Sequence, residues 1–404
     1  MTTLFTRTWV LLICATLVEA WLCFAGLYGV GNPMGDLSLA YEPWVARVLD
    51  GHLLLGISTP WVYPVLALVP IFLAKFVGFG ILVPGWLVLQ YLTLLTVLLL
   101  LVNFGKPSGV ERAQRFGAGY FWLACLLLLG PVSISRIDFF SVSIVVIAGL
   151  AISSSKQNLA TILVTLAAWI KVWPVAVFSA IWVAATSRRT IVLRAAAVCV
   201  AIILPAFLLG ANTSLFGFVG DQLSRGIQIE SPWASPWLVA NSLGDVYSAI
   251  SYNRGLQTFE VAGPKVELFA QLLGLVQLGA LLITVGLGYL AIRRSSAAKE
   301  VLVWVAFTAT LDLIFFNKVG SPQFITWLSA VSVIGLLLAA RNFWPALGLV
   351  LSISALTGLV YPLIYDAILA GSLLETLILQ LRNLLLLVAL VYANLRLSAL
   401  TKRV

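Results

Sequence analysis

The chain has 404 residues, of which 61% are hydrophobic and 10% are charged. Soluble proteins carry about 25% charged residues, so this sequence cannot cover a water-exposed surface, and lipid must surround most of it. The net charge of +9 is divided into short basic clusters between apolar runs. That pattern is typical of cytoplasmic loops in membrane proteins and argues against nucleic-acid binding.

Apolar runs long enough to cross, or half cross, a bilayer core of about 30 Å follow one another along the chain. They cover residues 8–29, 81–104, 116–131, 138–153, 191–210, 267–292, 300–316, 323–340, 343–360 and 376–395. Two more runs are ambiguous: residues 62–77 contain Pro64 and Pro70, and residues 159–186 are interrupted by Lys171 and Pro174. The fold class expected is all-α and integral to the membrane, with about 12 transmembrane helices.

Loop charge decides between two arrangements of the ambiguous runs. If 62–77 crosses fully and 159–186 crosses once, the charges that face outside are those of Lys106, Arg112, Arg115 and Lys156. If 62–77 is a partial helix and 159–186 is two half-length helices meeting at Lys171, those charges face inside. We prefer the second arrangement, which obeys the positive-inside rule; both arrangements place the two termini in the cytoplasm.

The sequence predicts one polytopic membrane domain over residues 1–404. It comprises an N-terminal helical module (1–210) with an outer loop at 30–61, a long outer loop at 211–265 and C-terminal helices over 266–404. In the first outer loop, apolar residues recur at helical spacing from Ser38 to Asp50. This periodicity predicts a short amphipathic helix at the membrane interface.

Ionisable residues at the edge of a span are costly to insert, so each one needs a reason. Asp36 has two interpretations, a helix N-cap or a general base. Arg136 and Asp138 form either a structural ion pair or part of a site. Lys171 either extends its ammonium group to the membrane surface or, because Pro174 breaks the helix, lines a cavity.

The later polar segments have the same two kinds of interpretation. Arg225, Gln228 and Glu230 belong either to a solvated loop or to a site, and Lys318 lies either in a plain turn or in a site. The preferred topology brings these residues to the face that holds Asp36. Four cations around one or two carboxylates suit an anionic ligand at the lipid–water boundary, with a lipid phosphate the first candidate.

Several segments, in this order, resemble the polytopic GT-C-type glycosyltransferases that use polyprenyl-phosphate sugars. The likeness points to actinobacterial mannosyltransferases that extend phosphatidylinositol mannosides and lipoglycans, and more distantly to the catalytic subunit of GPI mannosyltransferase I. It rests on Asp36 with Tyr41, Trp61-Val62-Tyr63-Pro64, Ser135-Arg136-Ile137-Asp138, Ile170-Lys171-Val172-Trp173-Pro174, Arg225-Gly226-Ile227-Gln228-Ile229-Glu230-Ser231 and Phe316-Asn317-Lys318-Val319-Gly320-Ser321-Pro322-Gln323-Phe324 with Trp327.

The resemblance implies transfer of a sugar, with mannose preferred, from a polyprenyl phosphate to a glycolipid on the outer face of the plasma membrane. Asp36 would be the catalytic base; the donor phosphate would contact Lys318, Arg225, Lys171 and Arg136; substrate contacts would come from Tyr41, Tyr63, Asp138, Gln228, Glu230 and Gln323. A single base with a cationic cluster implies direct displacement with inversion.

The GPI enzyme carries a paired Asp-x-Asp in the first outer loop, whereas this chain has Asp36-Leu37-Ser38. We therefore expect no cofactor and no divalent metal. Two alternatives stay open: an arabinofuranose or glucose donor on the same carrier, and a transporter or flippase for a lipid-linked sugar. Transporters usually have related halves, and residues 1–200 and 201–404 show no correspondence.

Overall fold

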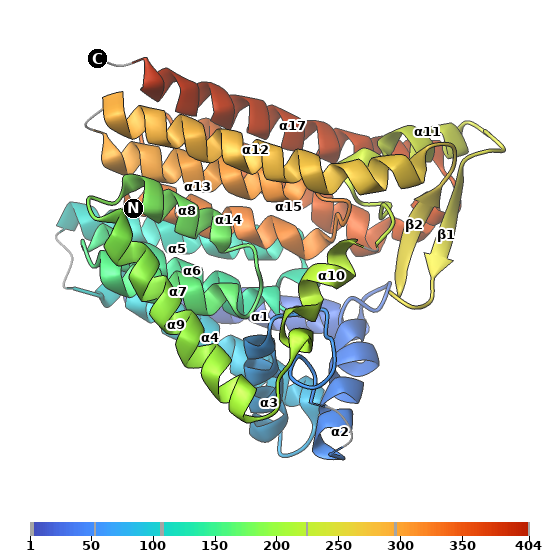
Figure 1. Ribbon diagram of the computed structural model, residues 1–404, viewed down its shortest axis with the longest axis horizontal. Coiled ribbons are helices and arrows are strands. Elements are labelled where there is room, and N and C mark those ends of the chain that lie inside the picture. The colour runs from blue at the N-terminus through green and yellow to red at the C-terminus, as the bar shows by residue number, and fades with distance from the viewer. Residues whose placement is uncertain (1–3, 52–53, 106–108, 224, 295–296, 403–404) are drawn as a thin grey trace.

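The computed structural model describes residues 4–51, 54–105, 109–223, 225–294 and 297–402. These residues form a bundle of helices whose axes run roughly along one direction (Figure 1). Both chain termini lie at one end of the bundle, and the β-hairpin and the short helix α2 lie toward the other (Figure 1). The candidate site residues lie toward this second end.

Within the described residues, six helices are long and apolar enough to cross a membrane. They are α1 (Thr8–Tyr28), α4 (Leu82–Asn103), α9 (Arg188–Leu208), α12 (Val266–Arg294), α15 (Trp344–Gly358) with the turn η7 (Leu359–Leu363), and α17 (Leu373–Thr401). The other bundle helices are α3 (Leu68–Val77), α5 (Gly109–Leu129), α6 (Asp138–Ser153), α7 (Gln157–Ala168), α8 (Val175–Ala184), α13 (Ala298–Phe315) and α14 (Ile325–Leu337). The predicted helical membrane fold is confirmed at this level.

Each of the two ambiguous runs forms short helices and no full-length span. The run at 62–77 contains the turn η2 (Val65–Ala67) and α3, whose ten residues rise about 15 Å, half of a bilayer core. The run at 159–186 is divided into α7 and α8, and Lys171 lies in the non-helical stretch between them. Pro174 fits there because a proline cannot donate the hydrogen bond that a continuous helix would require.

The end of the bundle opposite the termini is built from short elements. The first loop forms a π-helical turn η1 (Leu37–Tyr41) and then α2 (Glu42–Leu49), where the amphipathic helix was predicted. Later segments add η3 (Pro131–Ser133), η4 (Thr213–Phe216), α10 (Gly217–Leu223), η5 (Pro232–Ala234), α11 (Ser235–Ser242), η6 (Pro322–Phe324) and α16 (Tyr365–Leu369).

The expectation of an all-α chain is wrong in one place. Residues 249–262 form an antiparallel hairpin of β1 (Ala249–Asn253) and β2 (Thr258–Ala262), with Ala249 opposite Ala262 and Asn253 opposite Thr258. Its strands carry the β-branched and aromatic residues that favour extended backbone, and the turn at 254–257 contains Gly255. Residues 227–229 bond to the free edge of β2, through Ile229 N to Phe259 O and Val261 N to Ile227 O.

The 211–265 segment is folded onto the bundle and has a core of its own. Ile227, Ile229, Trp237, Leu238 and Val261 pack there with residues of α12, α16 and α17. The interpretation of Gln228 and Glu230 as part of a solvated loop is therefore wrong, since Gln228 is only 3% exposed and Glu230 only 8%, whereas Arg225 is partly exposed.

Candidate active site

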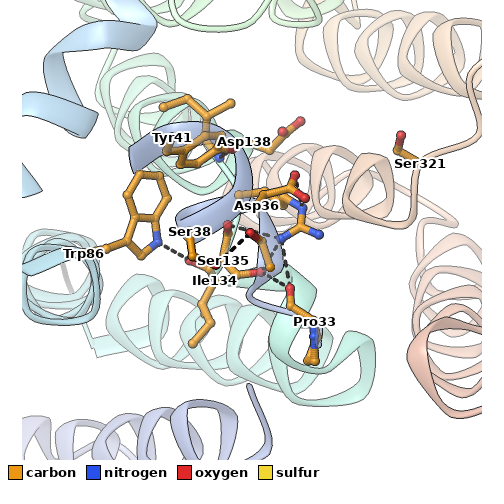
Figure 2. A network of polar contacts seen from close by, with 12 residues as sticks. Pro33, Asp36, Ser38, Tyr41, Trp86, Ile134, Ser135, Asp138 and Ser321 are labelled. Carbon is orange, nitrogen blue, oxygen red and sulfur yellow. Dashed lines mark hydrogen bonds and ion pairs between the residues drawn. The ribbon is translucent and has the colours of Figure 1, made fainter. Parts of the chain in front are cut away.

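Asp36 forms an ion pair with Arg136, in which Arg136 Nε lies 2.9 Å from Asp36 Oδ2. The Asp36 side chain is 44% exposed, whereas that of Arg136 is 7% exposed. Figure 2 shows the Asp36 carboxylate above the loop that carries Pro33, with Ser135 beside it. The alternative in which Arg136 pairs with Asp138 is absent from the described ion pairs, in which Asp138 is bound to Lys171 instead.

Arg136 is fixed by further hydrogen bonds. Its Nη1 donates to Pro33 O at 2.9 Å and to Ser135 Oγ at 3.0 Å, and Ser135 Oγ donates to the same Pro33 carbonyl at 3.0 Å (Figure 2). These bonds join the start of the first loop to the turn between α5 and α6. Arg136 therefore holds the backbone beside Asp36 and orients its carboxylate.

A cavity of about 800 Å³ opens in front of Asp36. Its lining is polar and aromatic, and includes Asp36, Trp44, Arg47, Trp61, Tyr63, Arg136, Arg225, Gln228, Glu230, Tyr252, Ser321, Gln323, Tyr361, Tyr365 and Asp366. Asp36 and Ser321 lie on different elements at this cavity (Figure 2). We call it the polar cavity. Aromatic faces beside hydrogen-bonding groups are the surfaces that sugar rings contact.

A second cavity, of about 430 Å³, has a mainly apolar lining. It includes Val172, Phe218, Val219, Ala270, Gly274, Leu313, Phe316, Phe324 and Trp327, together with the cations Lys171, Arg225 and Lys318. We call it the apolar cavity. Val172 and Val219 on its rim are 45% and 53% exposed, so its edge is continuous with the apolar surface of the bundle.

The two cavities meet, since five residues line both: Val62, Tyr63, Arg225, Ser321 and Gln323. Arg225 Nε is buried there and has no hydrogen-bond acceptor among the described residues. A buried guanidinium N–H without an acceptor is unfavourable, and an anionic oxygen would satisfy it. The junction is thus suited to a phosphate group that links an apolar chain to a polar head group.

Lys318 lies beside this junction. Burial lowers the pKa of its ammonium group, and the like charge of Arg225 lowers that pKa further against the opposing effect of Glu260. The two cations therefore lie close enough to repel each other in the described structure. An anion bound between them would relieve that repulsion.

The loop that carries Lys318 is attached to the segment that carries Gln228 and Glu230. Gln228 N donates to Lys318 O at 2.9 Å, and Ser231 Oγ donates to Asn317 O at 2.7 Å. At Gly320, a Cβ would lie 2.2 Å from the carbonyl carbon of Glu230. The two backbones pass too closely for any side chain, which explains a glycine in this motif.

Lys171 is held by a buried carboxylate. Its Nζ lies 3.1 Å from Asp138 Oδ2 and 4.4 Å from the centre of the Tyr63 ring. The other oxygen of Asp138 accepts a 2.7 Å hydrogen bond from Trp327 Nε1. Asp138 thereby positions both the ammonium group and the indole at the wall of the apolar cavity.

The structure does not bring two of the expected substrate contacts to a cavity surface. Asp138 is 1% exposed and Tyr41 has no exposed surface, and neither lines the polar or the apolar cavity. The hydroxyl of Tyr41 accepts a hydrogen bond from Ile137 N at 3.1 Å, and its ring packs on Trp44 and Trp86. In the described structure both side chains support the walls from behind.

Three residues outside the expected set surround Glu230. Tyr365 donates to Glu230 Oε1 at 2.8 Å, and Arg382 Nη2 donates to the Glu230 carbonyl at 2.7 Å. Tyr361 lines the polar cavity beside Tyr365. Arg382 was visible in the sequence as a cation within an apolar run, but no local pattern indicated its partner.

Among the described residues, no three His, Cys, Asp or Glu side chains are grouped as metal ligands would be. Comparison with protein-family models and with curated proteins found no match to this chain.

Proposed function

We propose that this chain is a multi-pass membrane glycosyltransferase that transfers a sugar, with mannose as the preferred donor sugar, from a polyprenyl phosphate to a glycolipid. The observation that carries the proposal is the meeting of a polar and an apolar cavity at a cluster of cations, with one carboxylate exposed on the polar side. An amphiphilic phosphodiester has the same three parts: an apolar chain, an anionic phosphate and a polar sugar.

The donor is proposed to bind across the junction. The polyprenyl chain occupies the apolar cavity, and the phosphate contacts Arg225 and Lys318, with Lys171 at its edge. The sugar enters the polar cavity near Tyr63 and Gln323, and the acceptor sugar binds beyond it near Gln228 and Glu230. Arg136 is reassigned in this scheme to positioning Asp36, because its Nε and Nη1 already bind protein groups.

The proposed reaction is a single displacement. Asp36 accepts the proton of an acceptor hydroxyl, and that oxygen forms a bond to the anomeric carbon of the donor sugar. The bond from the anomeric carbon to the phosphate oxygen breaks, and the electron pair leaves with polyprenyl phosphate. The cations stabilise the additional negative charge on the leaving phosphate. Attack from the face opposite the phosphate inverts the anomeric centre.

The finer topology belongs to the same proposal. We propose about 12 crossings, counting α7 and α8 as two half-length helices, with both termini in the cytoplasm. The cavities then face the outside of the plasma membrane. The two termini lie at one end of the bundle, and α2 and the β-hairpin, which carry residues that line the polar cavity, lie toward the other (Figure 1), which supports this orientation.

The test is transfer by the purified protein in proteoliposomes. Labelled polyprenyl-phosphate mannose would be supplied with octyl mannoside as acceptor, beside matched arabinofuranose and glucose donors. Labelled dimannoside product with an inverted linkage is expected, and Asp36→Asn should form none. Movement of intact donor between leaflets without any transfer would instead identify a flippase and overturn the proposal.

A further inference from the structure

A group of arginines lies at the start of α9 and the end of α12, which are on the side of the bundle that holds both termini (Figure 1), and none of them lines either cavity. Arg188, Arg189 and Arg194 lie in the first two turns of α9, and Arg293 and Arg294 end α12. None of the five takes part in an ion pair within the part of the chain that the structure describes. Like charges repel one another, so an anion would stabilise the group.

Tyr289 of α12 brings two of these arginines together. Arg188 Cζ lies 4.8 Å from the centre of the Tyr289 ring, and Arg293 Cζ lies 4.7 Å from the same centre. Arg188 also lies over the ring of Trp182 in α8, at 5.6 Å. Cation–π contact holds each guanidinium group in place before any ligand arrives. Two cations from different helices are therefore already oriented around one aromatic ring.

The hydrogen bonding of Arg188 is incomplete. Its Nη2 donates to Val183 O at 3.0 Å, but its Nε is buried without an acceptor among the described residues. The side chain of Ser187, the residue before α9, caps no backbone amide of the helix, and its hydroxyl is hydrogen-bonded to the Thr190 hydroxyl at 2.7 Å. The first amide groups of a helix also favour an anion. Arg293 supplies a second charge over the same Tyr289 ring that Arg188 contacts.

We propose that Arg188, Arg293 and Tyr289 bind the phosphate of an anionic phospholipid. A phosphate offers several oxygens to the arginine donors, and each guanidinium group can bind two of them. The neighbouring helix surfaces favour a lipid over free phosphate. Val192 and Leu193 on α9 and Leu290 on α12 are 47%, 58% and 44% exposed, which leaves apolar surface for acyl chains beside the charged site. Basic pockets between helix ends bind such head groups.

The test is native mass spectrometry of the full chain released from nanodiscs of phosphatidylglycerol and phosphatidylcholine mixed equally. We expect the wild type to retain phosphatidylglycerol selectively. The double variant Arg188→Gln/Arg293→Gln should retain at most roughly one tenth of the wild-type amount. Arg293→Gln alone, at an exposed position, and Tyr289→Leu, which keeps both charges, should each reduce retention several-fold. The matched control is Arg112→Gln/Lys156→Gln, which removes two cations that each lie over a phenylalanine ring.

Unchanged retention in the double variant would overturn the site. Equal loss in the control would also overturn it, because the effect would then follow net charge. Displacement of phosphatidylglycerol by an equal concentration of inorganic phosphate would overturn the lipid as ligand. None of these measurements depends on glycosyl transfer, so their outcome is independent of the proposed reaction.

Discussion

The carboxylate of Asp36 and the guanidinium of Arg136 are 2.9 Å apart, and the arginine is buried while the aspartate is half-exposed. Because Arg136 also binds the Pro33 carbonyl and the Ser135 hydroxyl, it is anchored on the protein side of the pair. The exposed oxygen-bearing side of Asp36 faces the polar cavity. The pair thus presents one oriented carboxylate to a substrate.

Asp36→Asn removes the proposed base without changing the size of the side chain. We expect kcat to fall by roughly 10²- to 10⁴-fold, the usual contribution of a general base. The matched control is Asp366→Asn, an exposed carboxylate that lines the same cavity. Steady-state transfer in proteoliposomes measures both. Wild-type turnover in Asp36→Asn would remove the proposed base.

Arg136→Lys keeps the positive charge but cannot bind Asp36, Pro33 and Ser135 together. We expect kcat to fall with little change in the KM of the donor, because the variant misplaces a carboxylate and leaves the donor contacts intact. Arg47→Lys, at an exposed arginine of the same cavity, is the control. A raised donor KM with normal kcat would mean that Arg136 binds phosphate, as the sequence suggested.

Lys318→Ala removes a cation from the junction of the cavities. We expect the KM of the donor to rise roughly 10- to 100-fold, since a hydrogen bond to a charged group is worth about 1.5–3 kcal/mol. The KM of the acceptor should change much less. Lys265→Ala, which lies at the start of α12 and lines neither cavity, is the control. Equal weakening of donor and acceptor would contradict a role in phosphate binding.

Gly320→Ala tests the attachment of the Lys318 loop to the Glu230 segment. The added Cβ would meet the backbone of Glu230 and Ser231 at 2.2 Å, so one of the two segments must shift. We expect a loss of about 1–3 kcal/mol in unfolding free energy, typical of overpacking. Thermal unfolding in detergent measures it. Gly279→Ala on α12, where nothing lies within 4 Å, should be neutral or slightly stabilising.

Glu230 predicts a pH dependence of stability. Burial raises the pKa of its carboxyl group above the usual value, against the hydrogen bond from Tyr365 and the charge of Arg382, which lower it. The folded state therefore binds the proton more tightly than the unfolded chain does, and stability is greatest below the unfolded pKa. It declines as the pH rises from about 4.5 through the higher folded pKa.

Glu230→Gln cannot titrate, so its unfolding temperature should depend less on pH across that range. Unfolding followed by tryptophan fluorescence at several pH values compares the two proteins. Parallel curves for wild type and variant would show that Glu230 does not contribute to the pH dependence.

The helices could be predicted because hydrophobic runs and helix breakers are local signals. The run at 138–153 coincides with α6, and Pro174 marked the break between α7 and α8. The hairpin at 249–262 was missed because its alternating pattern is short and lies among polar loop residues. Its stability also depends on residues 227–229, which bond to its edge.

The sequence indicated the residues near the cavities better than it indicated their partners. One cavity or both are lined by Asp36, Tyr63, Arg225 and Lys318. The sequence suggested that such residues lie together because the preferred topology places their loops on one face of the membrane. The pairing of Asp36 with Arg136, and of Asp138 with Lys171, depends on how distant helices pack. Spacing along the chain carries no record of such packing.

The hydrogen bond from Arg382 to the Glu230 carbonyl also has a consequence for biosynthesis. Its two residues are separated by 152 positions, and Arg382 belongs to α17, which is synthesised after the segment that carries Glu230. While earlier helices enter the membrane, the segment that carries Glu230 lacks this donor. We infer that the wall of the polar cavity becomes fully ordered only after α17 has inserted, so a nascent chain halted before that helix would lack the proposed transfer activity despite carrying Asp36.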